Sequence, residues 1–284
     1  MNKINAFVNG DYLPAEEACL NIEDRASLFG DGCYEFFKVH RGKVFETEAH
    51  LKRLHYSAGE LEIRIPYSDK EITEILDKLI ELNSIEYGGI YLQLTRGAAP
   101  RIHNYPDRCS PNFFIVAREM PPMEKKLLEE GIKAVLLPDE RWKRCDIKSL
   151  NLLANIMAKE KAKKMGALDA ILYSELGVTE STSSSVLAVL NGELVTTPEG
   201  NWILPGLTKR VAMRIAKENN INVQERFMST DELLAAEEIM LAGTRIDLLP
   251  VTELDGKPVG TGKVGPVTKI LLSGFARALD ENVK

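Results

Sequence analysis

Stretches typical of β-strands alternate with stretches typical of amphipathic helices along this 284-residue chain, and this alternation most restricts how it can fold. The Asn-Gly pair at 9–10 and the Arg-Gly pair at 41–42 each separate two short apolar stretches, which predicts two β-hairpins. Ser68 and Glu71 precede apolar residues at helical spacing, which predicts a helix that starts with a capping box. Together these signals predict an α/β (α+β) fold.

The stretch MPPMEKK, residues 120–126, has paired prolines and charges without apolar periodicity, which is typical of a linker between domains. We therefore expect a smaller N-terminal α/β domain over residues 1–119 and a larger C-terminal domain over residues 127–284. In the second domain, the Asn-Gly pair at 191–192 predicts another hairpin. Ser and Glu at 229 and 232 predict another capping box.

Charge and cysteine content argue against several classes of protein. The formal net charge of −6 and an isoelectric point near 5.5 provide no basic field for nucleic acid. Four scattered cysteines without a CxxC pair or a suitably spaced histidine predict neither disulfides nor a metal site, and a reducing cytoplasm fits best. The N-terminus lacks the apolar core of a signal peptide, and no stretch is apolar enough for a membrane span. We therefore expect neither export nor a membrane partner.

Lys148 stands in RCDIKSLNLLANIMAK, where charged residues give way to apolar ones. The spacing predicts a helix from Ser149 whose apolar face includes Leu153 and Met157, with Lys148 at its entrance. A lysine amine can act as a Schiff-base catalyst when burial or a nearby cation keeps part of it neutral, and residues 143–144 are such cations. The alternative is a solvated lysine at a helix start, which is commoner for a lysine taken alone.

Three further stretches carry candidate ligand-binding groups. Glu180 is followed by five hydroxyl residues at 181–185 and an apolar strand, and a carboxylate placed there needs a cationic partner to offset its desolvation. Leu207 and Thr208 follow Pro-Gly at a predicted helix start, where free N–H groups bind anions. Arg53 lies on an amphipathic helix, and its guanidinium suits a phosphate. Taken alone, these are more often a surface turn, a helix cap and a solvated arginine.

Together, these stretches resemble a known family. RCDIKSLNLL, the Glu180 turn, LPGLTKR, EAHLKRL and DRASLFGDGCYEFFKV are similar to the class IV (fold type IV) pyridoxal-phosphate aminotransferases, in order and across nearly the whole chain. This group includes D-amino acid aminotransferases, branched-chain aminotransferases and aminodeoxychorismate lyases. The resemblance implies a two-domain enzyme that binds pyridoxal 5'-phosphate, has its active site at the domain interface and works as a homodimer.

The resemblance also implies a role for each candidate residue. Lys148 would form the Schiff base with the cofactor and, once released, move the proton between substrate and cofactor carbons. Glu180 would pair with the pyridine nitrogen and keep it protonated. The phosphate would be bound by Arg53, by the N–H groups of Leu207 and Thr208, and by the Thr244 hydroxyl. Leu204 would pack against the cofactor ring.

The loop AAPRIHNYPDRCSP separates two predicted strands, and loops of this length in compact domains are usually functional or disordered. Arg101 and His103 match an Arg-x-His of D-amino acid aminotransferases, where this pair, from the neighbouring subunit, traps the substrate carboxylate together with a tyrosine that matches Tyr34. The resemblance thus implies ping-pong transfer of the amino group from a D-amino acid, such as D-alanine or D-glutamate, to a 2-oxo acid such as 2-oxoglutarate.

Three alternatives remain beside this function. They are an aminodeoxychorismate lyase, a branched-chain L-amino acid transaminase, and a relative that has lost catalysis and serves as a binding protein. The lyases generally lack the Arg-x-His pattern. Branched-chain enzymes usually have a glycine and then a tyrosine shortly after the lysine, and KSLNLLANIMAK has neither. The loop therefore favours the D-amino acid enzymes.

Two stretches depart from the family pattern. The usual turn after the cofactor glutamate is Glu-Gly-Ser/Thr-x-Ser-Asn, whereas this chain has Ser181 for the glycine and Ser185 for the asparagine. A glycine there commonly permits a backbone angle that serine disfavours, so the departure bears on where Glu180 points. In LAGTRID, Gly243 replaces a hydroxyl residue. Arg245 either points into the pocket, where it favours a substrate with a second carboxylate, or faces solvent.

Overall fold

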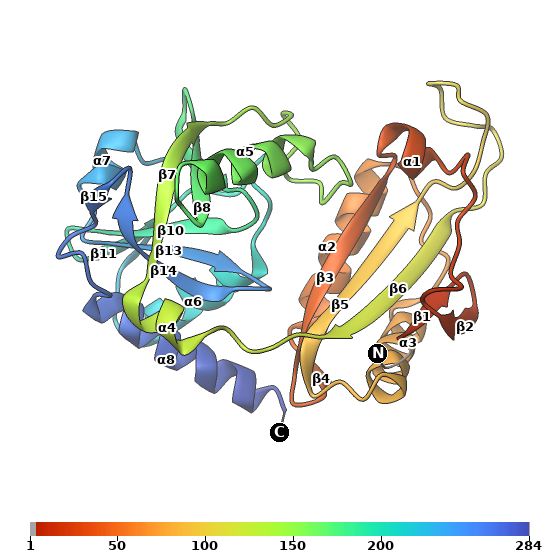
Figure 1. Cartoon of the computed structure of the whole chain (residues 1–284), viewed down its shortest axis with the longest axis horizontal. Coiled ribbons are helices and arrows are strands. Elements are labelled where there is room, and N and C mark those ends of the chain that lie inside the picture. Colours follow the sequence, from red (N-terminus) through yellow and green to blue (C-terminus); the bar gives the residue numbers. More distant parts are fainter. Residues whose placement is uncertain (1–3, 284) are drawn as a thin grey trace. The chain divides into compact units, whose positions relative to one another are not determined.

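The computed structural model describes residues 4–283 of the chain, which divides into two compact units (Figure 1). The first unit contains the chain up to Pro122, Ile147–Asn151 and the residues from Asn282 onward, and the second contains Met123–Asp146 and Leu152–Glu281. Lys148 therefore belongs to the first unit, although it follows the predicted linker in the sequence. The predicted domains also include residues 1–3 and 284, which lie outside the described residues.

The first unit is built on a six-stranded sheet whose neighbouring strands are all antiparallel. Its strands are β1 (Asn5–Val8), β2 (Asp11–Pro14), β3 (Gly32–His40), β4 (Lys43–Val44), β5 (Tyr87–Thr95) and β6 (Asn112–Glu119), and their order in the sheet is β2-β1-β6-β5-β3-β4. The predicted hairpins at 9–10 and 41–42 are confirmed, and all four turn residues have the positive φ that type I′ turns require.

Two helices cover one face of this sheet and form its core. The helices of the unit are α1 (Arg25–Phe29), α2 (Thr47–Glu60) and α3 (Asp69–Leu82). Leu54 of α2 and Leu76 of α3 are fully buried in one cluster with Phe37 of β3 and Ile90 of β5. The predicted capping box at the start of α3 is confirmed.

The second unit is built on a nine-stranded mixed sheet. Its strands are β7 (Ile132–Pro138), β8 (Asp169–Ser174), β9 (Gly177–Ser181), β10 (Ser185–Leu190), β11 (Glu193–Thr196), β12 (Val223–Glu225), β13 (Glu238–Gly243), β14 (Asp247–Leu254) and β15 (Lys257–Pro258). Their order is β12-β11-β10-β13-β14-β7-β8-β9, and β15 pairs with β14. The pairs β14-β7, β7-β8 and β11-β12 are parallel and the others are antiparallel. The predicted hairpin at 191–192 joins β10 to β11.

Five helices accompany this sheet in the described residues: α4 (Lys125–Glu130), α5 (Leu153–Lys164), α6 (Leu207–Glu218), α7 (Thr230–Leu234) and α8 (Pro266–Glu281). α6 and α8 approach each other closely, because a Cβ added to Gly274 would lie 2.4 Å from Ile215 Cγ2. The predicted capping box at the start of α7 is confirmed. Within residues 4–283, no helix is long and apolar enough to cross a lipid bilayer. Both units mix strands and helices, as the predicted fold class requires.

The prediction of a helix from Ser149 was wrong. Helix α5 begins at Leu153, and Ser149 instead forms a bridge with Cys33 of β3. The reason is that the backbone groups of this segment bond to β3, so they cannot form helical hydrogen bonds. The predicted apolar face is not buried either, since Leu153 is 70% exposed and Met157 is 58% exposed.

Candidate active site

The segment that carries Lys148 is fixed to the first unit by its backbone. The Lys148 carbonyl accepts the Tyr34 N–H at 3.0 Å, and the Lys148 N–H donates to the Ser57 hydroxyl at 3.0 Å. Gly32 permits this close approach, because a Cβ there would lie 2.8 Å from Leu150 Cδ1. The Lys148 side chain takes no part in these bonds, and its Nζ lies 4.2 Å from the centroid of the Tyr34 ring. Two predicted site residues are thus brought together.

Arg53 lies in a buried ionic cluster in the same unit. Its Nε donates to Glu35 Oε1 at 2.7 Å and its Nη2 donates to Glu35 Oε2 at 2.9 Å. His50 Nδ1 lies 2.8 Å from Glu35 Oε2. Burial opposes the ionisation of Glu35, but Arg53 and His50 hold its pKa below the ordinary value. Burial also lowers the pKa of His50, which keeps the imidazole neutral at physiological pH.

Arg101 and His103 lie in the loop between β5 and β6, and both flank the ring of Phe29. The Arg101 Cζ is 5.1 Å from the centroid of that ring, and the centroids of the His103 and Phe29 rings are 5.5 Å apart. Both side chains are exposed. Tyr34 lies in another cluster, where its ring stacks on Tyr91 with the centroids 5.5 Å apart.

Two buried arginines hold the backbone and a side chain of this loop. Arg25 Nη1 donates to the carbonyl of Ile102 at 2.6 Å, and the Arg96 Cζ lies 3.5 Å from the centroid of the Tyr105 ring. Both arginines donate their Nε to Asp31 Oδ2, at 2.7 and 2.8 Å. One buried carboxylate therefore orients both guanidinium groups.

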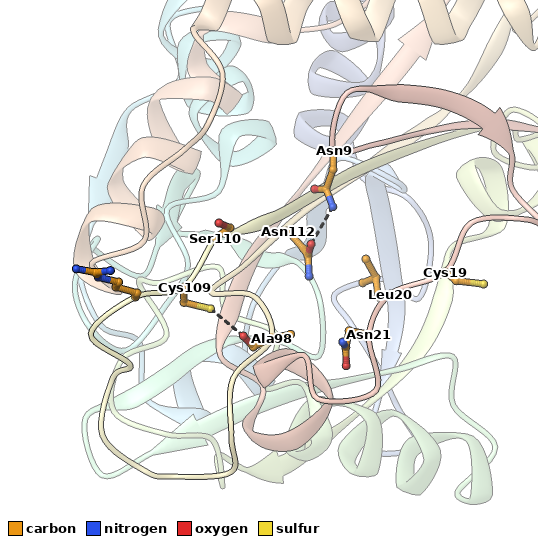
Figure 2. A pocket seen from close by; sticks show the side chains of 9 residues that line it. Asn9, Cys19, Leu20, Asn21, Ala98, Cys109, Ser110 and Asn112 are labelled. Atoms are coloured by element: carbon orange, nitrogen blue, oxygen red, sulfur yellow. Dashed lines mark hydrogen bonds between the residues drawn. The ribbon is translucent and has the colours of Figure 1, made fainter.

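A pocket of about 450 Å³ opens where this loop joins the sheet (Figure 2). Its lining is mostly polar and consists of Asn9, Cys19, Leu20, Asn21, Ala98, Arg108, Cys109, Ser110 and Asn112. The Asn9 amide donates to Asn112 Oδ1 at 2.8 Å, and the Cys109 thiol lies 3.3 Å from the Ala98 carbonyl oxygen. Because the lining includes none of the predicted site residues, this pocket is separate from the candidate site.

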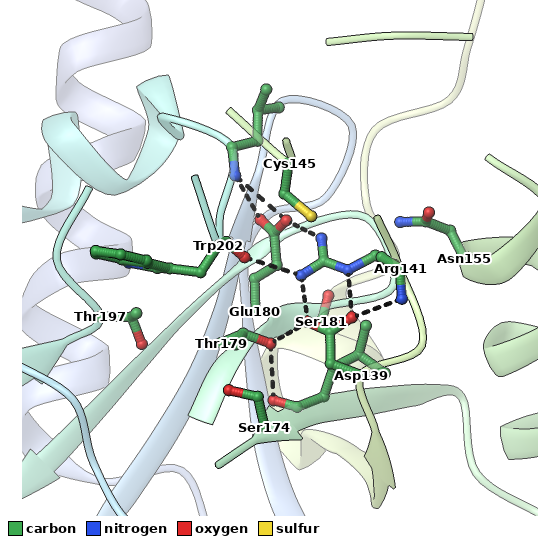
Figure 3. A network of polar contacts seen from close by, with 12 residues as sticks. Asp139, Arg141, Cys145, Asn155, Ser174, Thr179, Glu180, Ser181, Thr197 and Trp202 are labelled. Atoms are coloured by element: carbon green, nitrogen blue, oxygen red, sulfur yellow. Dashed lines mark hydrogen bonds and ion pairs between the residues drawn. The ribbon is translucent and has the colours of Figure 1, made fainter. Parts of the chain in front are cut away.

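Glu180 lies in a buried polar network of the second unit (Figure 3). Its Oε1 contacts the Arg141 guanidinium and also accepts the Leu204 N–H at 3.3 Å. The cationic partner that the sequence argument required is therefore Arg141. Asp139 binds the same guanidinium through both of its carboxylate oxygens, and the Thr179 hydroxyl donates to Asp139.

The charges of this network are set by burial and by Arg141. Burial raises the pKa of Glu180 above its ordinary value, and the Arg141 guanidinium opposes that rise. Burial also works against the ionisation of Asp139, but hydrogen bonds from Arg141 and Thr179 bring its pKa below the ordinary value. Arg141 keeps its charge, because the two carboxylates raise its pKa despite burial.

Helix α6 begins without a capping side chain. Its N-cap is Gly206, and a Cβ at this position would lie 2.3 Å from the Ser185 hydroxyl. Leu207 and Thr208 lie in the first turn of α6. Their backbone N–H groups have no hydrogen-bond acceptor within the helix. Such an end favours an anion.

Both departures from the family pattern are accommodated. Ser181 closes β9 with a strand backbone, so no glycine is needed there. Its hydroxyl lies 2.6 Å from the Ser184 hydroxyl and accepts the Ser184 N–H at 3.0 Å. In the second stretch, Thr244 is half-buried and Arg245 is exposed. A Cβ on Gly243 would lie 3.0 Å from Ser184 Cβ.

Comparison with known proteins gives the family of the chain. Residues 32–254 match the family described as amino-transferase class IV. The chain is 40% identical over 282 residues to a D-alanine aminotransferase of Staphylococcus aureus strain COL, with 99% of both chains covered. It is 41% identical over 279 residues to a D-alanine aminotransferase of Listeria monocytogenes, with 97% of this chain and 96% of the relative covered. The chain belongs to the class IV aminotransferases.

Solved structures agree with this assignment. The branched-chain amino acid aminotransferase of Escherichia coli is 26% identical, with a TM-score of 0.91 and with 97% of this chain and 94% of that chain covered. The branched-chain aminotransferase of Thermoproteus uzoniensis, at 24% identity, has a TM-score of 0.87, with 99% of this chain and 96% of that chain covered. The predicted fold is confirmed. Class IV aminotransferases are pyridoxal-phosphate-dependent transferases, so the predicted enzyme class and cofactor are confirmed too.

In this class IV aminotransferase, sequence reasoning missed the charged partners of two predicted residues. Glu35 was not predicted as the partner of Arg53, and Arg141 was not predicted as the partner of Glu180. The need of Glu180 for a cation was a usable signal, but three cations stand close together at 141–144 and no spacing rule selects one. The guanidinium of Arg144 is paired with Asp146 at 2.9 Å.

Proposed function

We propose that this class IV aminotransferase moves the amino group of a D-amino acid, with D-alanine and D-glutamate as the expected donors, to a 2-oxo acid such as 2-oxoglutarate. The observation that carries the proposal is that Arg101 and His103, two side chains of one exposed loop, both lie near the ring of Phe29. A guanidinium and an imidazole on the same loop suit a carboxylate. Relatives about 40% identical over nearly their whole length that carry the name D-alanine aminotransferase support the same substrate class.

The residues of the second unit fit pyridoxal phosphate. Two carboxylates, Asp139 and Glu180, share one guanidinium, so the buried network would carry one excess negative charge with both carboxylates ionised. A protonated pyridine nitrogen would neutralise that charge. The uncapped start of α6, with the N–H groups of Leu207 and Thr208, suits the phosphate.

Each remaining predicted residue has a task in this proposal. Bound pyridoxal phosphate supplies an electron sink for the electron pair left when the α-proton of the amino acid departs. Lys148 Nζ attaches the cofactor and then carries that proton. Arg53 and the Thr244 hydroxyl bind the phosphate, and Leu204 packs against the ring. Tyr34, Arg101 and His103 bind the α-carboxylate of the amino acid.

The wider organisation stays a prediction as well. We propose a homodimer in which Arg101 and His103 serve the site of the neighbouring subunit. That proposal accounts for two exposed, polar side chains on a firmly held loop. A site at the junction of the two proposed domains and a cytoplasmic location also remain predictions.

A branched-chain L-amino acid transaminase is the strongest rival, because solved branched-chain enzymes share the fold with TM-scores near 0.9. An aminodeoxychorismate lyase is the second rival. A spectral panel on the holoenzyme separates the three functions: D-alanine, D-glutamate, L-leucine, L-glutamate and aminodeoxychorismate are each added without an oxo acid. We expect the cofactor band to bleach with the D-amino acids. Bleaching by L-leucine alone, or pyruvate release from aminodeoxychorismate, would overturn the proposal.

A further inference from the structure

The carboxylate assigned to the pyridine nitrogen is already bonded to a guanidinium. Glu180 Oε1 contacts Arg141, and the Leu204 N–H is the other donor to this carboxylate among the described contacts. Figure 3 shows the Arg141 side chain lying between the carboxylates of Glu180 and Asp139. The Arg141 side chain is buried, with 6% of its surface accessible.

Arg141 is held in place on the side away from Glu180. Its Nε donates to Asp139 Oδ1 at 2.9 Å and its Nη2 donates to Asp139 Oδ2 at 2.7 Å, which is a bidentate pair. Nη2 also donates to the Trp202 carbonyl at 3.1 Å. The Thr179 hydroxyl fixes Asp139 in turn, at 2.6 Å. The planar guanidinium therefore has one orientation, and it presents Nη1 to Glu180.

The charge balance of the network depends on this one cation. With Arg141 present and both carboxylates ionised, the network would carry a single negative charge, which one cationic ligand group can neutralise. With Arg141 removed, two buried carboxylates would stand without a cation in the network, and burial favours the neutral form of such groups. Glu180 would then take up a proton and could no longer attract a proton to the ring nitrogen.

We propose that Arg141 is a positioning residue, which keeps Glu180 ionised and oriented so that Glu180 holds the cofactor ring in its protonated form. The inference rests on the proposed function, because it requires Glu180 to face the ring nitrogen. The inference adds a role for a second charged side chain, Arg141. Without touching the cofactor, Arg141 would control how strongly the ring withdraws electrons.

The test reads the protonation state of the ring nitrogen directly. Apo-protein is reconstituted with pyridoxal phosphate labelled with ¹⁵N in the ring, and the ¹⁵N chemical shift is measured for wild type, Glu180→Gln and Arg141→Met. We expect a protonated ring in the wild type and an unprotonated ring in both variants. The dissociation constant of pyridoxal phosphate should rise at least about tenfold in Arg141→Met, the change that corresponds to one pKa unit of lost interaction.

Two further variants test whether the effect is specific to Arg141 and whether it requires the guanidinium. Arg226→Met removes an arginine that pairs with Glu232 at 2.8 Å on the surface of the same unit, and it should change neither the ¹⁵N shift nor the affinity. Arg141→Lys keeps a positive charge but cannot form the bidentate pair with Asp139, so it should give an intermediate shift. Thermal unfolding of each apo-protein checks the fold. If Arg141→Met does not fold, Arg141→Lys decides the question: a wild-type shift and affinity would overturn the inference.

The outcomes separate the two proposals. If the ring is unprotonated in the wild type, or stays protonated in Glu180→Gln, then Glu180 does not face the ring nitrogen, and both the proposed placement and this inference are overturned. If Glu180→Gln loses the ring proton but folded Arg141→Met keeps it, the placement of Glu180 stands and the inference alone is wrong. Loss of the ring proton in both variants supports it.

Discussion

Arg25 Nη1 donates to the main-chain carbonyl of Ile102 at 2.6 Å, so an arginine of helix α1 holds a loop residue that lies 77 positions later in the chain. Ile102 stands between Arg101 and His103, the two side chains that we propose to bind the substrate carboxylate. A loop with no strand or helix of its own thereby obtains a fixed backbone at the position where recognition needs it.

Replacing Arg25 should therefore weaken substrate binding and leave cofactor binding intact. In Arg25→Met the loop loses a charge-assisted hydrogen bond worth about 1.5–3 kcal/mol, so the KM for D-alanine should rise roughly tenfold to a hundredfold. Steady-state kinetics measure this, together with the dissociation constant of pyridoxal phosphate. Arg64→Met, at an exposed position of the same unit, is the matched control. An unchanged KM in a folded Arg25→Met variant would contradict the proposed role of the loop.

Replacing Lys148 should greatly slow turnover without disturbing the fold. The segment is held through the Lys148 carbonyl and N–H, and both persist in Lys148→Ala. Loss of the group that carries the proton should slow the half-reaction with D-alanine by about 10²-fold to 10⁴-fold. The free energy of unfolding of the apo-protein should change by less than about 1 kcal/mol.

The half-reaction of Lys148→Ala is followed by stopped-flow absorbance. Its control is Lys164→Ala at the exposed end of α5, which should react at the wild-type rate. A Lys148→Ala enzyme that reacts at the wild-type rate, or that without added amine keeps a cofactor adduct reducible by borohydride, would exclude Lys148 as the attachment point.

The cluster of Glu35, Arg53 and His50 should make stability depend on pH in the acidic range. Because the folded-state pKa of Glu35 is lowered from its ordinary value of 4.5, its contribution to stability is full above that value and is lost as the pH falls through the folded pKa. In Glu35→Gln the buried guanidinium loses its anion, which should cost about 3–5 kcal/mol at pH 7. Urea unfolding at pH 7 and pH 4 measures both effects.

The difference in unfolding free energy between wild type and Glu35→Gln should shrink as the pH falls below 4.5. Glu81→Gln is a suitable control, because Glu81 forms an exposed pair with Lys78 in the same unit. It should change the stability by well under about 1 kcal/mol at either pH. A difference for Glu35→Gln that is the same at both pH values would show that folding does not lower the pKa of Glu35.

Restoring the glycine of the family pattern at position 181 should destabilise this protein. Ser181→Gly removes an acceptor of the Ser184 N–H and a partner of the Ser184 hydroxyl, both in a buried turn. It also adds backbone freedom to the unfolded chain. We expect a loss of about 1–3 kcal/mol in unfolding free energy. Ser183→Gly at the exposed position of the turn is the comparison, and equal losses in the two variants would contradict a special role for Ser181.

What the sequence predicted correctly is mostly local. The capping box of Ser68 and Glu71 involves residues three positions apart, and the hairpin turns need only two adjacent residues with positive φ. Signals of this kind act within one turn of the chain, so they can be read without tertiary contacts. The family resemblance added the order of the site residues along the chain.

The helix start after Lys148 could not be predicted in the same way. Apolar spacing at residues 149–157 is compatible with a helix throughout, but β3 takes the hydrogen bonds of the first part. The choice of Arg141 as the partner of Glu180 has a similar origin, because 39 positions separate the two residues. Contacts of this kind depend on which strands become neighbours, and no local pattern encodes that.

Because Ile147–Asn151 is attached to β3, the first unit is formed by separate stretches of the amino-acid sequence. An expression fragment that ends at Pro122 would lack the stretch whose Lys148 carbonyl receives the Tyr34 N–H, so part of β3 would be left as an open edge. Such a fragment should be prone to self-association. During translation, the ribosome must synthesise the chain past residue 151 before the first unit can complete its fold. Folding of the first unit therefore depends on translation of part of the second.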